Sequence, residues 1–147
     1  MANANELKLI TQFLKDFSFE SPNAPALFFQ KENSAAKMEI NPDIQIKGAE
    51  NNLYMVDLVT KVHSKLEAGD KSIFMIDATY SGLVSAKYDN EAELQHALLV
   101  QIPALLFPGL RGLVLRVTAE SGFPPFAMQS VDFEALYQQR KAVAKKK

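Results

Sequence analysis

The strongest constraint on the fold is an alternating segment, residues 11–20, that is followed by two closely spaced prolines. Its odd-numbered side chains are mostly aromatic, and its even-numbered ones are mostly polar. Successive side chains of an extended strand point to opposite faces, so the pattern predicts a β-strand with one apolar face. Pro22 and Pro25 have no N–H for a sheet ladder and should end this strand. We expect a loop after them that carries the apolar run Leu27-Phe28-Phe29.

Three further segments show strand patterns. Residues 36–46 alternate, with Pro42 on the apolar parity, which favours an edge strand. Residues 53–66 and 71–84 have the longest strand patterns, and their apolar residues share even numbers. Opposed residues point to the same face, so the numbers of each pair must sum to an even value. We therefore expect a five-residue connection or a bulge, with Leu66 opposite Ser72 and Lys61 opposite Asp77.

The pattern then changes to that of helices. Asp89-Asn90 is a suitable N-cap for a first helix, which Pro103 is expected to end. A second helix is expected from Pro108 to Gly122, followed by an aromatic loop at residues 123–126. A last helix is expected from Val131, fraying through Gln138 and Gln139 and ending in the lysines. Strands followed by helices are typical of an α+β domain, here a four-stranded antiparallel sheet followed by two to three helices packed on one face.

Composition narrows the class of protein. The length suits one domain, residues 1–137, with a net charge of −6, and residues 138–147 form a flexible basic tail of net charge +5. An acidic body disfavours nucleic-acid binding. Without cysteine there is no disulfide framework and no zinc knuckle. No uninterrupted apolar stretch approaches 18 residues, so we expect a cytoplasmic protein that does not insert into a membrane.

No catalytic or metal-binding constellation is evident in the sequence. His63 and His96 have no carboxylate partner at ligand spacing, and the six glycines form no phosphate-binding motif. Glu91 and Glu93 are better explained as the first turn of a helix, where its dipole favours acids. We therefore expect no enzyme activity, no cofactor and no metal.

Four motifs occur in the order and spacing of one known family. They are the segment K-D-F-S-F-E-S-P-N-A-P from Lys15, Tyr80-Ser-Gly82, Leu106-Phe-Pro-x-x-Arg111, and Gly122-Phe-Pro-Pro125 with Val131-Asp-Phe133. Together these resemble SecB, the export chaperone of Gram-negative bacteria, over about nine-tenths of the chain. The resemblance implies an ATP-independent holding chaperone that binds unfolded export precursors and delivers them to the translocation ATPase SecA. It further implies a homotetramer, a dimer of dimers, with the helix from about Glu91 to Ile102 between dimers.

The resemblance also assigns two surfaces. The acidic outward face of the sheet would dock SecA through Asp16, Glu20, Met75 and Asp77; without the resemblance, such charges are explained as protection against aggregation. Apolar side chains outside a closed core would form a client groove; the alternative explanation, equally good for each loop aromatic, is that it plugs an end of the sheet. The candidate lining is Phe28, Phe29, Ile40, Tyr54, Phe126 and Tyr137. Two alternatives remain: a chaperone for one dedicated client, such as an antitoxin, and an α+β domain with a small-ligand pocket.

Overall fold

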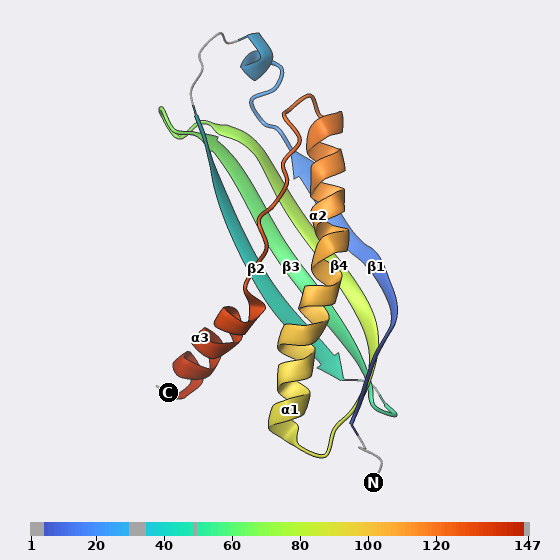
Figure 1. Ribbon diagram of the computed structural model, residues 1–147. Coiled ribbons are helices and arrows are strands. Elements are labelled where there is room, and N and C mark those ends of the chain that lie inside the picture. The colour runs from blue at the N-terminus through green and yellow to red at the C-terminus, as the bar shows by residue number, and fades with distance from the viewer. Residues whose placement is uncertain (1–4, 30–34, 49, 146–147) are drawn as a thin grey trace. The chain divides into compact units, whose positions relative to one another are not determined.

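The fold is α+β, with four strands followed by helices. The structure is a computed structural model, and it describes residues 5–29, 35–48 and 50–145. The strands β1 (Glu6–Glu20), β2 (Ala36–Gly48), β3 (Leu53–Leu66) and β4 (Ser72–Lys87) form one antiparallel sheet in the order β1-β4-β3-β2 (Figure 1). The helical segments are α1 (Glu91–His96), η2 (Ala97–Gln101), α2 (Ile102–Glu120) and α3 (Phe133–Lys145). The predicted fold class is confirmed.

The strands pass through two compact units. The helical unit comprises Met1–Phe13, Ile44–Leu58 and Tyr80–Lys147, and it contains α1, η2, α2 and α3. The strand unit comprises Leu14–Asp43 and Val59–Thr79, with the short 3-10 helix η1 (Ala26–Phe29). β2 lies at an edge of the sheet, as Pro42 predicted.

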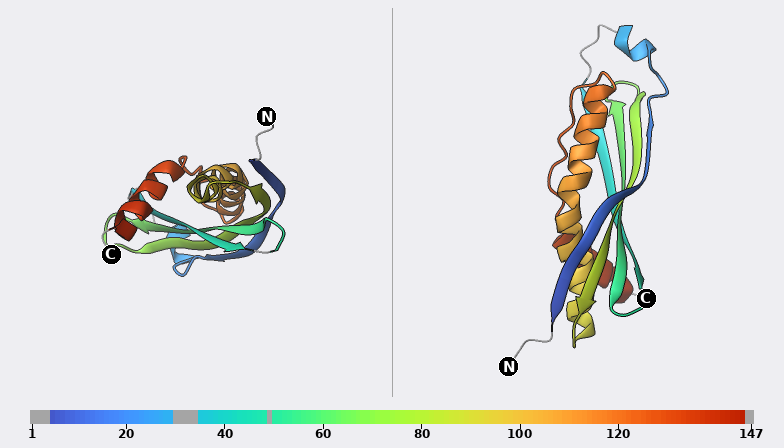
Figure 2. Two further views of the ribbon diagram at one scale, coloured as in Figure 1. Left: turned by 90° about the horizontal axis from the view of Figure 1, so that it is seen from below. Right: turned by 90° about the vertical axis from the view of Figure 1, so that its right-hand side faces the viewer.

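Close packing of α2 on β4 builds the core of the helical unit. Leu106, Leu110 and Val114 recur every four residues on α2 and are fully buried. Gly109 lies so close to Tyr80 that a Cβ there would be 2.6 Å from Tyr80 Cζ. At Gly82 of β4, a Cβ would be 3.0 Å from Leu106 Cδ2. Figure 2 shows the helices on one side of the strands of this unit.

The strand unit is built by alternation. Phe74 and Ile76 of β4 are buried, whereas Asp77 between Ile76 and the buried Ala78 is exposed. Phe19 of β1 stacks on Phe74, with 5.8 Å between the ring centroids. Phe19, which belongs to the aromatic face that the sequence predicted for β1, therefore packs on the neighbouring strand β4.

The proline-containing segment after β1 is tied to β4 by side chains. Ser21 Oγ donates to the carbonyl of Ile73 at 2.8 Å, and Asn23 Nδ2 donates to that of Ser72 at 2.9 Å. The segment Leu27-Phe28-Phe29 then lies in η1, not in the loop that was predicted. The N–H of Phe28 donates to the carbonyl of Pro25 at 2.9 Å, and this three-residue spacing makes a 3-10 turn.

The β3–β4 connection is five residues long, as predicted. The N–H of Leu66 donates to the carbonyl of Lys71 at 2.8 Å, one residue before the predicted partner Ser72. Val62 and Phe74, by contrast, are both buried and have numbers of the same parity. The predicted pairing of Leu66 with Ser72 is therefore wrong by one residue, and a match between the buried faces of the two strands requires one residue of offset beside the turn.

One helical run extends from Glu91 to Glu120, where two helices were predicted. Pro103 does not end it, and Pro108 lies inside it. The π-helical segment η2 precedes Pro103, and within it the N–H of Ile102 donates to the carbonyl of Ala97. The wider π-helical turn shifts the hydrogen-bond pattern just before Pro103, which has no N–H to donate. The helix therefore continues through this proline.

The joined helix is long and apolar enough to cross a membrane, judged by length and composition alone. Core helices of soluble proteins commonly pass the same test. Its buried residues Leu106, Leu110 and Val114 form the core of the helical unit, which is the role of a core helix.

The end of α2 follows the sequence prediction. Gly122 has a φ of 86°, and the N–H of Phe123 donates back to the carbonyl of Thr118 at 3.2 Å. A positive φ at this position is typical of a helix C-terminus and favours glycine. The segment 123–132 is neither helix nor strand, which confirms the predicted aromatic loop.

The last helix begins at Phe133, slightly later than predicted, and ends in the lysines as predicted. Asp132 caps α3, because its Oδ1 accepts the N–H of Ala135 at 3.0 Å. The helix continues to Lys145, so the predicted fraying through Gln138 and Gln139 is wrong. The separate basic tail at residues 138–147 stays a prediction, and residues 146–147 lie outside the described residues.

Candidate functional site

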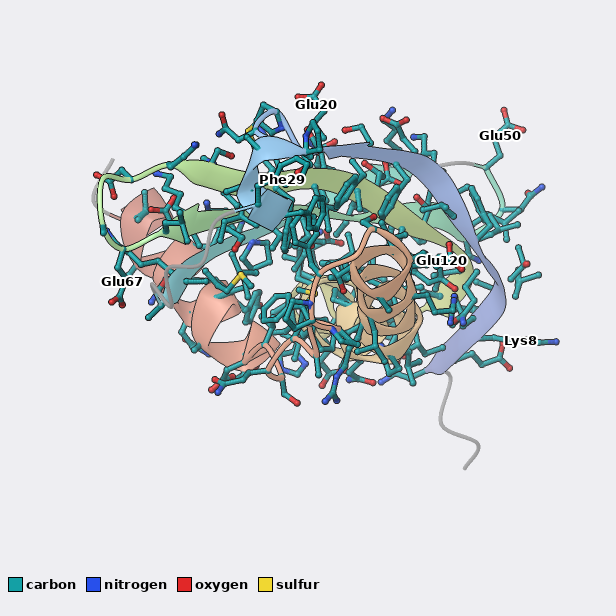
Figure 3. All side chains as sticks on the ribbon, turned by 90° about the horizontal axis from the view of Figure 1, so that it is seen from above. Lys8, Glu20, Phe29, Glu50, Glu67 and Glu120 are labelled. Carbon is teal, nitrogen blue, oxygen red and sulfur yellow. The ribbon has the colours of Figure 1, made fainter. Side chains whose placement is uncertain are left out.

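An acidic hollow of about 390 Å³ lies in the strand unit. Three of the four predicted SecA-docking residues, Glu20, Met75 and Asp77, line it, because β1 and β4 are neighbours in the sheet. Asp16 is exposed on β1 but is not among the lining residues. The side chain of Glu20 points away from the strands (Figure 3). The lining consists of Ser18, Glu20, Glu39, Asn41, Lys61, Val62, His63, Met75, Ile76 and Asp77.

One carboxylate of this hollow was missed in the sequence. Glu39 of β2 adds a third carboxylate, and its Oε1 lies 3.5 Å from Lys65 Nζ. Lys61 of β3, which was predicted to lie opposite Asp77, lines the same hollow. The alternation in the sequence places Glu39 on the outward face of its strand. Its position beside β3 could not be predicted, because it depends on the order of the strands in the sheet.

The charges of the acidic hollow suit a cationic partner. Glu20, Glu39 and Asp77 are carboxylates, and only Lys61 and His63 among the lining residues can carry positive charge. A hollow lined mostly by one sign of charge attracts the opposite sign and raises its local concentration. The acidic hollow is therefore suited to docking a basic segment.

A separate ion pair borders the β3–β4 turn in the strand unit. Lys37 Nζ lies 3.0 Å from Asp70 Oδ1. The hydrogen bond with Asp70 raises the pKa of Lys37, and the bond with Lys37 lowers the pKa of Asp70. Both groups are exposed, so solvent screens the pair and it contributes little to stability.

The helical unit contains an apolar hollow of about 690 Å³. Its walls come from β2, from the helical run that begins with α1, and from α3. Ile44, Leu99 and Tyr137 are buried at its wall, and Ile46 is half-buried. The full lining is Ile44, Gln45, Ile46, Ala92, Gln95, Leu99, Tyr137, Arg140 and Lys141.

Side-chain contacts hold α3 beside this apolar hollow. His96 Nε2 lies 2.8 Å from Glu134 Oε2, and the His96 ring meets Tyr137 edge to face at a centroid distance of 5.4 Å. Arg140 Nη2 donates to the carbonyl of Ile44 on β2 at 3.1 Å. His96 therefore has a carboxylate partner in the structure, although none lies at ligand spacing in the sequence. Glu134 lies 38 residues further along the chain, so spacing alone does not reveal the pair.

The other histidine is bonded within the strand unit. His63 Nε2 lies 3.0 Å from Ser72 Oγ, and the ring is half-buried. Neither histidine belongs to a cluster of three or more potential metal ligands among the described residues.

The six candidate groove residues are divided between the two units. Tyr137 lines the apolar hollow, whereas the half-buried Tyr54 and Phe126 belong to the same unit but not to its lining. Phe126 is held at the backbone, where its N–H donates to Thr118 Oγ1 at 2.9 Å. The remaining three residues, Phe28, Phe29 and Ile40, belong to the strand unit.

The strand unit exposes two large aromatic side chains. Phe28 and Phe29 of η1 are 51% and 80% exposed, and Ile40 is half-buried. A phenylalanine that is four-fifths exposed does not plug a core, so η1 is better explained as an apolar contact surface.

The chain matches the family model for SecB, the preprotein translocase subunit, over residues 1–144. The protein-export protein SecB of Caulobacter vibrioides is 37% identical over 139 residues, which cover 94% of this chain and 83% of that protein. The protein of the same name from Hyphomonas neptunium is 36% identical over 137 residues, 93% of this chain and 80% of that one. A SecB-like chaperone of Mycobacterium tuberculosis, solved with a peptide from an antitoxin, is similar in fold: the TM-score is 0.70 at 13% identity, covering 85% of this chain and 90% of that one.

Proposed function

The chain belongs to the SecB family, and we propose that it is an ATP-independent holding chaperone that binds unfolded or partly folded export precursors and delivers them to SecA. The observation that carries this proposal is the apolar hollow beside α3, whose walls are Ile44, Ile46, Leu99 and Tyr137. No nucleotide and no covalent step are required. The protein would act in the cytoplasm, before the precursor folds.

Client binding follows from burial of apolar side chains. Each Val, Leu or Phe that enters the apolar hollow contributes about 1.5–3 kcal/mol, without regard to the sequence around it. Phe28 and Phe29 on η1 offer a second apolar contact surface in the strand unit. A native protein has buried such side chains in its own core, so selection is for the unfolded state. Binding of that state alone opposes folding by mass action.

Delivery would use the acidic hollow. Glu20 and Asp77 lie there with the half-buried Met75, so a basic partner would find both opposite charge and an apolar contact. Asp16 on β1 would extend this surface for a larger partner. The proposed partner is SecA, reached through a basic segment.

Self-association is supported by apolar side chains that one chain leaves exposed. Ile10 and Phe13 of the edge strand β1 are 47% and 37% exposed, and Leu105 of α2 is 54% exposed. An unpaired edge strand with apolar side chains is ordinarily covered in the native assembly. The proposed assembly is a homotetramer, a dimer of dimers.

The test is the refolding of a slow-folding export precursor diluted from denaturant, with and without this protein and without nucleotide. We expect refolding to stop at about one tetramer per precursor and to resume when a competing unfolded chain is added. Undisturbed refolding would reject the general holding function. A dedicated client, such as an antitoxin, would then be the function to test, since the mycobacterial SecB-like chaperone was solved with an antitoxin peptide.

A further inference from the structure

We propose that Ser21 and Asn23 are positioning residues for client binding, because they hold the exposed aromatic side chains of η1 in one place on the strand unit. This inference rests on the proposed holding function and names the residues that prepare its second apolar contact surface. It is carried by two side-chain hydrogen bonds that join the proline-containing segment 21–25 to β4. The client group is an apolar side chain of an unfolded polypeptide, which would pack on Phe29.

Burial in the core does not fix the position of η1. This helix is four residues long, and none of its residues is buried. Phe28 and Phe29 are 51% and 80% exposed. A single 3-10 turn has little stability of its own, because a short helical segment gains few hydrogen bonds for the dihedral angles that it fixes. The direction of these rings therefore depends on how the chain before η1 is attached to the sheet.

Asn23 attaches η1 to the sheet most directly. Its side-chain Nδ2 donates to the carbonyl of Ser72 on β4 at 2.9 Å. Its backbone carbonyl accepts the N–H of Leu27, inside η1, at 3.1 Å. One half-buried residue therefore bonds β4 with its side chain and η1 with its backbone.

Ser21 makes a second attachment, directly after the end of β1. Its Oγ donates to the carbonyl of Ile73 at 2.8 Å, and its backbone carbonyl accepts the N–H of Ala24 at 3.2 Å. Pro22 and Pro25 lie in the same segment and have no N–H to donate. Side chains therefore make the contact with the sheet that backbone donors make in a strand.

The acceptors of both bonds lie on a fixed part of the sheet. Ser72 begins β4, and its Oγ lies 3.0 Å from Nε2 of His63 on β3. Phe74, next to Ile73, is buried and stacks with Phe19 of β1. β4 has a neighbouring strand on each side, so η1 is attached to a central strand of the sheet.

A contact surface that is ordered in advance binds an unfolded client more tightly than a mobile one. Ordering a loop at the moment of binding costs free energy, and this cost offsets part of the gain from burying the client's side chains. Removal of the Asn23 amide would release η1 from β4 and would take a donor from the carbonyl of Ser72. The expected consequence is weaker client binding, although Phe28 and Phe29 themselves are unchanged.

The test measures, by fluorescence anisotropy, the affinity for a labelled export precursor that is kept unfolded. N23A and N23D both remove the donor, N23A without adding charge and N23D without changing the shape of the side chain. We expect each to weaken binding by about three- to ten-fold. S21A should weaken it by about two- to five-fold, whereas S21T keeps the hydroxyl and should bind like the wild type. The control Asp70→Asn removes the exposed ion pair with Lys37 at the β3–β4 turn of the same unit and should leave the affinity unchanged.

A double-mutant cycle shows whether Asn23 acts through the aromatic side chains. In the F28A/F29A background, N23A should have no further effect on affinity, because the surface that Asn23 positions is gone. An equal loss from N23A in both backgrounds, or unchanged affinity in N23A and S21A, would overturn the proposal.

Two other outcomes distinguish this inference from the holding function. If the wild type arrests refolding while F28A/F29A binds the precursor as tightly as the wild type does, η1 is not a client surface and only this inference is rejected. If the wild type neither binds the precursor nor arrests its refolding, the holding function itself is rejected.

Discussion

At the scale of single residues, the contact between α2 and β4 depends on a glycine facing an aromatic ring. A Cβ at Gly109 would lie 2.5 Å from the hydroxyl oxygen of Tyr80 and 2.6 Å from two of its ring carbons. Real Cβ atoms do not approach so closely, so either the ring or the helix must move. Gly112, one turn further along α2, has only the flexible end of Arg116 nearby, at 3.2 Å.

These two glycines should respond oppositely to the same substitution. Gly109→Ala is expected to lower the free energy of unfolding by about 1–3 kcal/mol, because overpacking outweighs the gain in helix propensity. Gly112→Ala is expected to be neutral or to raise it by up to about 1 kcal/mol, because alanine favours a helix and the site has room. Urea unfolding of the two variants measures both. Equal effects of the two substitutions would contradict the proposed contact.

Two substitutions in the acidic hollow should change the affinity for SecA in opposite directions. Asp77→Lys should weaken SecA binding by at least about ten-fold while client binding is unchanged, because it replaces an attraction with a repulsion. Lys61→Thr should strengthen it by about two- to five-fold, since it removes the lysine that lies among three carboxylates. Titration of SecA against each variant measures this. Unchanged affinity in both would remove the acidic hollow from the proposed handover.

Alternation allowed part of this hollow to be predicted. Glu20 and Asp77 could be assigned to outward faces because a strand has a period of two. Lys61 could be placed opposite Asp77, because their strands follow each other in the chain. Glu39 has the same signal but could not be joined to them, since the strand order β1-β4-β3-β2 is not contained in any local pattern. The packing of Gly109 on Tyr80 could not be predicted either, because nothing in the sequence places this glycine over that ring.

At the scale of elements, the four strands were predictable and the helical run was not. Strand ends follow local chemistry, as at Leu66, where the predicted and observed ends coincide. Pro103 is a strong local signal for a helix end, yet burial of Ile102 and Leu106 on both sides of it favours one continuous helix. The π-helical turn at η2 lets the helix continue past Pro103, and such a turn has no reliable sequence signature.

The attachment of α3 is the element most open to a test. Glu134→Ala removes the carboxylate that bonds His96 Nε2, a partly exposed contact worth about 0.5–1 kcal/mol. Local opening of α3 should therefore become about two- to five-fold more frequent, as measured by amide hydrogen exchange in residues 133–145. Gln139→Ala, on an exposed position of the same helix, is the control and should leave exchange unchanged. Equal exchange in the two variants would show that the pair does not hold α3.

At the scale of the whole molecule, the two proposed sites are built from different residues, and the proposed assembly multiplies both. The apolar hollow belongs to the helical unit and the acidic hollow to the strand unit, so no residue lines both hollows. A single apolar hollow binds a few side chains only. Linked weak sites can raise affinity for one long chain by about 10²–10⁴, which is why the proposed tetramer matters for holding.

The double variant F13E/L105E should therefore separate assembly from client recognition. Both side chains are exposed on the helical unit, and charges there should oppose association, so sedimentation is expected to give a smaller particle. Val143→Glu places a charge on another exposed apolar position of that unit and should leave the particle size unchanged.

The double variant F13E/L105E should retain its affinity for a short peptide, because neither substituted residue lines the apolar hollow. Its affinity for a long unfolded precursor should fall by at least about ten-fold. If the smaller particle holds the precursor as tightly as the wild type, one chain is sufficient and avidity is not the basis of holding.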